Sequence, residues 1–140
     1  MLSKPRFGWC LVSISTWKDR GSYLDDIPLK LLLACQTVLL EHRPFAVLFD
    51  AEGYEYTIEF RSEEVEITTC TIEDEIITRV FDIPVYYLAS ELIRDIRRDL
   101  EDWVFWPPTS ESPGFDADAR RTQLLNLCDI VEELLPKNFS

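Results

Sequence analysis

Hydrophobic and polar positions alternate along much of this chain, and the alternation predicts its strands. Between residues 54 and 61 the sequence reads YEYTIEFR, which is typical of a strand with one buried face and one solvated face. Residues 45–49, 65–72 and 76–81 are also β-like, and residues 7–15 are apolar on both faces. The pattern predicts four or five strands, with 7–15 as an interior strand followed by a polar exit.

The pairing of residues 54–61 with 65–72 follows from the need to keep the two apolar faces in phase. Phe60 then lies opposite Val65, which places Glu59 opposite Glu66 on the solvated face. Two carboxylates at this spacing repel each other at a cost of about 0.2 to 1 kcal/mol. We expect a basic side chain of a partner to relieve this repulsion by docking between them.

Three other segments repeat their apolar residues at spacings of three and four, which predicts helices. They lie between residues 25 and 44, 82 and 106, and 116 and 135, with aspartates or prolines at their starts. The middle helix opposes an apolar stripe with a face of charged side chains, which we expect to be solvated. Residues 109–114 are typical of a flexible loop.

These elements predict an α+β fold, in which an antiparallel-dominated sheet of four to five strands has three helices packed mainly on one face. The 140 residues fit a single domain spanning 1–140. The longest uncharged apolar run, residues 31–40, is shorter than the roughly 20 residues that cross a bilayer. No signal peptide pattern precedes residue 7, and we therefore expect a cytoplasmic protein that does not bind membranes.

Residue types that carry chemistry do not form a pattern in this sequence. The single histidine, His42, ends the first predicted helix, where interaction with the last carbonyl groups is the simpler interpretation. No GxSxG, HExxH, Walker A or GxGxxG motif occurs, and the four glycines are isolated. The four cysteines lack a CxxC pair and are interpreted as free thiols packed as small hydrophobes. We assign no catalytic, cofactor-binding or metal-binding residue.

Net charge is −12, and its location along the chain indicates the class of partner. Residues 50–75 carry ten acidic side chains against one basic side chain, Arg61, which leaves −9 in this stretch. Such a field repels nucleic acids and accelerates association with basic surfaces. The pair Glu59 and Glu66 could act as general acid and base, and the acidic turns could hold Ca²⁺, but a solvated acidic surface is the simpler interpretation.

The aromatic segment at residues 103–106, followed by two prolines, is the second notable feature. Trp106 either caps the end of the core or is exposed as an interface anchor. With it, the residues that we expect to bind a basic protein partner are Asp50, Glu52, Glu55, Glu59, Glu63, Glu64, Glu66 and Trp106.

In size, acidity and α+β layout, with its acids concentrated on YEYTIEFRSEEVEI, the chain resembles the small immunity proteins that neutralise bacterial toxins. The resemblance covers the general format of the whole chain and no diagnostic motif. It implies a non-enzymatic protein that blocks a basic, nuclease-type toxin by occupying its active-site cleft. Three alternatives stay open, namely a nucleic-acid mimic, a structural subunit or homodimer, and a small enzyme or ligand-binding domain.

Overall fold

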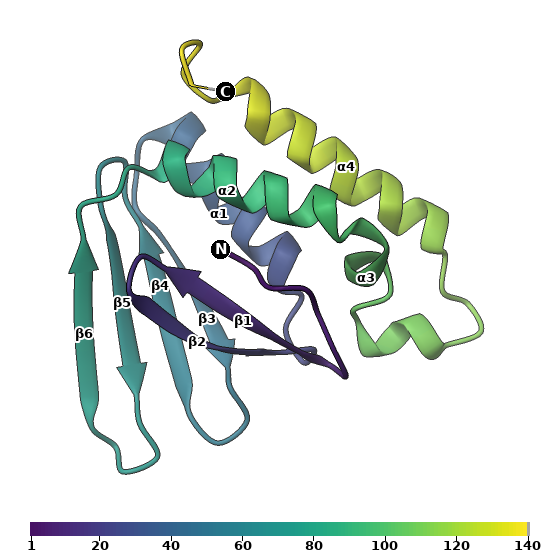
Figure 1. Cartoon of the computed structure of the whole chain (residues 1–140), viewed down its shortest axis with the longest axis horizontal. Helices are drawn as coiled ribbons and strands as arrows, with labels where there is room; N and C mark the ends of the chain where they lie inside the picture. Colours follow the sequence, from purple (N-terminus) through teal and green to yellow (C-terminus); the bar gives the residue numbers. More distant parts are fainter. Residues whose placement is uncertain (140) are drawn as a thin grey trace.

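The structure is a computed structural model that describes residues 1–139 (Figure 1). It has the predicted α+β architecture, with one antiparallel sheet of four strands in the order β3-β4-β5-β6 and a separate two-stranded hairpin, β1-β2. The elements, in chain order, are β1 (Trp9–Ile14), β2 (Trp17–Ser22), α1 (Ile27–Glu41), β3 (Phe45–Asp50), β4 (Glu55–Phe60), β5 (Val65–Cys70), β6 (Ile76–Phe81), α2 (Val85–Arg98), α3 (Leu100–Val104), the 3₁₀ helix η1 (Pro108–Glu111) and α4 (Ala117–Glu133).

The four-stranded sheet is a simple meander whose register confirms the prediction. Phe60 pairs with Val65, and Glu59 pairs with Glu66. The alternation decides which face is buried, because Ile58 and Phe60 are fully covered while Thr57 and Glu59 are not. The sheet therefore has a helix-facing side and an outer face that no other helix or strand of residues 1–139 covers (Figure 1).

The hairpin β1-β2 corrects the prediction for the N-terminal segment. Residues 7–15 do not supply an interior strand of the main sheet, and the expected polar exit is itself strand β2. Trp17 of β2 packs edge-to-face on Tyr56 with ring centroids 5.2 Å apart, so the hairpin covers the helix-facing side of the sheet. Gly21 makes this packing possible, since a Cβ there would lie 2.4 Å from Cδ1 of Ile27.

The helices form a layer on the same side of the sheet (Figure 1). Helix α1 packs directly on β3 and β4, and α2 and α4 pack on α1. The helix predicted between residues 82 and 106 is divided at Asp99 into α2 and α3. Its apolar stripe is buried at Leu88, Leu92, Ile96 and Trp103 and half-buried at Leu100. The expected flexible loop at 109–114 overlaps η1.

Two buried charged side chains connect elements that are distant in the sequence. Asp95 was expected on the solvated face of α2, but it is 2% exposed and accepts hydrogen bonds from the Met1 amino group and the Leu2 N–H, at 2.7 and 2.9 Å. Arg120 of α4 donates to Asp26 through two nitrogens, at 2.8 and 3.0 Å. Asp26 precedes α1 and makes no capping hydrogen bond with its side chain, because Arg120 takes both oxygens.

All four cysteines are free thiols, and three of them lie in the core as small hydrophobes. Burial raises the pKa of Cys10 and of Cys35 to about 12, which leaves both protonated at neutral pH. Cys70 is half-buried on β5. Within residues 1–139, no helix is both long enough and apolar enough to span a bilayer.

Candidate functional site

The outer face of the four-stranded sheet carries the predicted acidic side chains, but it also carries apolar ones. Pairing places Glu59 and Glu66 in one row between Ala46 and Val80. The neighbouring rows mix threonines with further acidic and apolar residues. The whole outer face consists of Ala46, Leu48, Asp50, Glu55, Thr57, Glu59, Glu66, Thr68, Cys70, Ile76, Thr78 and Val80.

The opposed carboxylates Glu59 and Glu66 are already neutralised from within the chain. The guanidinium of Arg61 lies between them and donates to Glu59 through Nε at 2.9 Å and to Glu66 through Nη2 at 2.7 Å. It also donates to Glu64 at 2.6 Å, and its hydrogen bonds to Glu64 and Glu59 raise the pKa of Arg61. The place that we expected a partner's cation to fill is therefore occupied by Arg61.

Uncompensated charge gathers instead where the β3-β4 and β5-β6 loops lie side by side at one end of the sheet (Figure 1). Within residues 1–139, none of the acidic side chains at these two loops forms an ion pair with a basic residue. A hollow of about 340 Å³ between the loops is lined by Asp50, Glu55 and Asp74. We call this surface the acidic end; it consists of Asp50, Glu52, Glu55, Glu73, Asp74 and Glu75.

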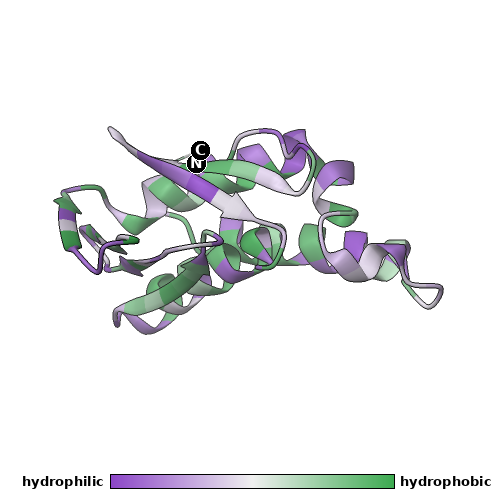
Figure 2. Cartoon of the chain, turned by 90° about the horizontal axis from the view of Figure 1, so that it is seen from below, coloured by the Kyte–Doolittle hydropathy of each residue, from purple (hydrophilic) through white to green (hydrophobic). Residues whose placement is uncertain are grey.

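Strand β6 borders the acidic end and forms the open edge of the sheet. Its residues are hydrophobic for the most part, as the green of the strand at the left edge of Figure 2 shows. Their side chains are nevertheless largely exposed. Ile76 is 73% exposed and Ile72, in the preceding loop, is 74% exposed, while Ile77 and Val80 are half-exposed. Exposed apolar side chains that stand together are typical of interaction surfaces.

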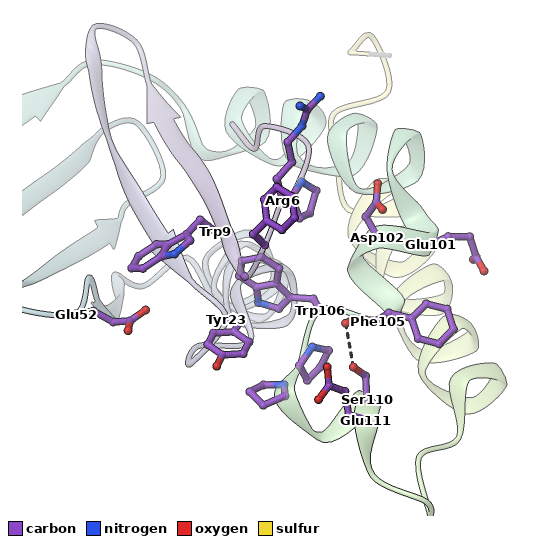
Figure 3. A pocket seen from close by; sticks show the side chains of 15 residues that line it. Arg6, Trp9, Tyr23, Glu52, Glu101, Asp102, Phe105, Trp106, Ser110 and Glu111 are labelled. Carbon is purple, nitrogen blue, oxygen red and sulfur yellow. Dashed lines mark hydrogen bonds between the residues drawn. The ribbon is translucent and has the colours of Figure 1, made fainter.

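A second concave surface, a cleft of about 780 Å³, lies between the N-terminal segment and the α3-η1 region (Figure 3). Its walls combine aromatic side chains, such as Trp9, Tyr23 and Phe105, with carboxylates. Arg121 donates to Glu101 at 2.8 and 2.6 Å, and this pairing lowers the pKa of Glu101. Aromatic faces beside carboxylates suit a cationic side chain. This cleft could not be predicted from sequence patterns, because its residues come from four separate segments.

Trp106 forms part of the cleft floor and is not an exposed anchor. Its side chain is 5% exposed, its ring lies 5.1 Å from that of Trp103, and its Nε1–H donates to the Asp25 carbonyl oxygen at 2.8 Å. Of the two interpretations offered by the sequence, the structure favours the one in which Trp106 caps the core. Phe105, its neighbour, is the exposed aromatic residue of this segment.

The turn beside the cleft holds the backbone of Phe7 in an unfavourable left-handed conformation. Phe7 has φ of +53° and a fully exposed side chain, in a two-residue turn closed by backbone hydrogen bonds between Arg6 and Trp9 of 2.8 and 2.9 Å. Gly8 follows it with φ of +79°. Asn-Gly is the pair that such turns favour, whereas a bulky residue at positive φ is strained.

We expect the substitution Phe7→Asn to raise the free energy of unfolding by about 1 kcal/mol, because it removes backbone strain without removing a buried contact. Urea denaturation of both proteins measures the difference. The matched control is Phe7→Val, which also removes the ring but places a β-branched residue at positive φ, so it should destabilise the protein. A loss of stability in Phe7→Asn would show that the ring makes a stabilising contact.

No protein-family model matches the sequence, and searches of curated proteins and of solved structures gave no significant match. Within residues 1–139, no three histidine, cysteine or acidic side chains are placed to hold a metal ion. Two surfaces of the molecule are candidate binding sites, namely the sheet surface with its acidic end and the aromatic cleft.

Proposed function

We propose that this chain is a non-enzymatic protein-binding domain whose sheet surface docks a basic partner protein. The observation that carries the proposal is the acidic end, where six carboxylates at two adjacent loops have no basic partner within residues 1–139. Unpaired charge of one sign steers an oppositely charged partner and orients it at encounter. The exposed isoleucines beside the acidic end add apolar surface, which contributes binding energy once the partner has been attracted by charge.

The proposed contact centre differs from the one that the sequence suggested. Glu59, Glu64 and Glu66 already accept hydrogen bonds from Arg61, so a partner cation would have to compete with an intramolecular ion cluster. Asp50, Glu52 and Glu55 belong to the acidic end, and these predicted residues stay in the proposed site. We place Glu63, which is exposed at the opposite end of β4 and β5, at most at the rim.

The partner class that we propose is a basic, nuclease-type bacterial toxin. A nuclease cleft is positively charged because it holds a phosphate backbone, and a compact array of carboxylates complements it. The resemblance to small immunity proteins supports the same class. A nucleic-acid mimic would also bind basic proteins, but it would bind several of them, and its binding would weaken steeply with salt.

Charge reversal at the acidic end tests this proposal. The variant Glu55→Lys, Glu73→Lys, Glu75→Lys avoids Glu52 and Asp74, whose positive φ values would add backbone strain. Like charges facing each other across the interface should weaken partner binding by about 100-fold or more. The matched control carries the same charge change on exposed helix positions, as Glu41→Lys, Asp118→Lys, Glu133→Lys.

The measurement is affinity capture from native lysate on wild type, variant and control, with salt washes and identification by mass spectrometry. A single basic protein held by wild type and control, but absent from the sheet variant, supports the proposal. A basic protein held equally by the sheet variant overturns it. A broad, salt-sensitive set of nucleic-acid-binding proteins would identify mimicry instead.

A further inference from the structure

The free edge of β6 is a ready acceptor for another strand. β6 pairs with β5 over six residues, from Ile76 opposite Cys70 to Phe81 opposite Val65, without interruption. Its other edge carries backbone N–H and C=O groups that meet no other strand of residues 1–139. Natural sheets protect such edges with lysines, prolines, bulges or short strands. β6 has no proline, no bulge and no lysine.

The single basic residue of β6 does not block this edge. The guanidinium of Arg79 lies over the ring of Phe81, 5.0 Å from its centroid, and donates to Thr16 Oγ1 at 2.9 Å. Both contacts draw it toward the hairpin side of the sheet, away from the outer face. An incoming strand therefore meets the backbone of β6 and its apolar side chains, with Arg79 held aside.

Apolar side chains are available to an added strand on both faces of the sheet. Ile76 and Val80 point to the outer face and Ile77 to the helix-facing side, as the pairing with β5 requires. All three are half-exposed or more. Side chains of an added strand would lie directly beside them, and such cross-strand contacts are the source of specificity in strand addition.

The charges around the edge decide which kind of strand fits. Residues 73–75 contribute three carboxylates before β6 and Asp82 contributes one after it, against Arg79, so the edge carries a net charge of −3. A second copy would place this edge against an identical one, on chains that each carry −12. A strand flanked by lysine or arginine neutralises the same groups, so charge complementarity selects a basic segment over self-association.

We propose that β6 accepts an extended segment of the partner as an added strand of the sheet, with alternating apolar side chains and basic residues at its ends. This inference rests on the proposed function and specifies its binding mode. The segment would lie beside Ile76, Ile77 and Val80, and its basic ends would lie near the acidic end and Asp82.

The first arm of the test uses the peptide KKVTVTVTKK and the full chain, observed through amide hydrogen exchange by NMR. In an added strand, every second N–H of β6 becomes hydrogen-bonded, so exchange of either 77, 79 and 81 or 76, 78 and 80 should slow by roughly tenfold or more at saturation. The control peptide EEVTVTVTEE should bind at least roughly tenfold more weakly. A third peptide, N-methylated at every residue of its VTVTVT segment, cannot donate along either edge and should give no protection. Unchanged exchange in β6, or equal protection by the N-methylated peptide, overturns strand addition.

The second arm separates this inference from the proposed function by using the captured partner. The variant Ile76→Glu, Val80→Glu adds negative charge at exposed positions and removes the apolar contact. If a strand docks there, partner binding falls by roughly tenfold or more, whereas attraction by charge alone would keep or strengthen it. Retained binding in this variant, with binding lost on charge reversal of the acidic end, overturns strand addition and leaves the proposed function standing. If neither variant loses partner binding, strand addition and the proposed function are both overturned. A dimer of the free chain in sedimentation would overturn the choice of a basic segment as the strand that occupies the edge.

Discussion

Replacing Arg120 with methionine will lower the free energy of unfolding by about 3 kcal/mol, because it removes the buried member of an ion pair whose carboxylate, on Asp26, is 29% exposed. Arg120 is buried and donates to both oxygens of Asp26 and to the carbonyl oxygens of Trp103 and Val104, at 2.8 to 3.1 Å. Methionine keeps much of the apolar stem and provides no donor. The Asp26 carboxylate and the Val104 carbonyl group then lose the donor that they share, whereas the Trp103 carbonyl group keeps the N–H of Trp106. Leaving these acceptors without a donor accounts for most of the lost stability.

Urea denaturation of wild type and Arg120→Met measures this effect, with Arg121→Met as the matched control. Arg121 is the next residue of α4 and pairs with Glu101 and Asp118 at the surface. Because solvent screens surface pairs, the control should unfold close to the wild-type midpoint. Equal, small changes in both variants would show that the Arg120 contacts do not hold α1, α3 and α4 together.

The substitution Asp95→Asn will destabilise the protein by about 3 kcal/mol at neutral pH. Burial opposes the charge of Asp95, but hydrogen bonds from the Met1 amino group and the Leu2 N–H, together with the charge of Arg98, outweigh it and hold the pKa of Asp95 below its ordinary value. A carboxyl group whose pKa is lowered by folding stabilises the folded state above the unfolded pKa, which is about 3.9 for aspartate. This stabilisation is lost as the pH falls through the lower, folded pKa.

The pH dependence distinguishes this role from simple packing. Asparagine does not titrate, so the difference in unfolding free energy between wild type and Asp95→Asn should be largest near neutral pH and shrink as the pH falls below about 4. Denaturation curves at neutral and acidic pH measure it. A difference that stays constant with pH would mean that the charge of Asp95 contributes nothing and that only its shape matters.

Strict alternation made the central sheet predictable. In β4 and β5 the apolar residues fall on one face only, so a shift of one residue would bury Glu59 and Glu66, and the register has one acceptable solution. Strand β2 lacked this signal because its sequence, WKDRGS, buries Trp17 and Gly21 but otherwise reads as a polar turn. Trp17 is buried against Tyr56 of the main sheet, which lies far along the chain, and Gly21 is buried against Ile27 of helix α1.

The ion pairs of the charged side chains were the part of the structure that the sequence predicted least well. Asp26 and Arg120 are 94 positions apart, and their pairing arises only once α1 and α4 are packed. Alternation along YEYTIEFR puts Arg61 on the same face as Glu59, but it does not show how far a long side chain reaches. The contacts of Arg61 with Glu59 and Glu66 were therefore missed. The predicted acidic surface exists, and its unpaired part lies at one end of the sheet.

The central claim, that the sheet surface binds a basic partner, is tested most directly by a hydrogen-exchange footprint of this chain with its captured partner. Exchange is compared between free and bound chain, segment by segment, under identical conditions. The proposed function predicts slowed exchange in residues 50–55 and 71–81, with α4 unchanged. Slowed exchange confined to residues 5–9 and 101–111, around the aromatic cleft, with the sheet unchanged, would contradict it and move the binding site to the cleft.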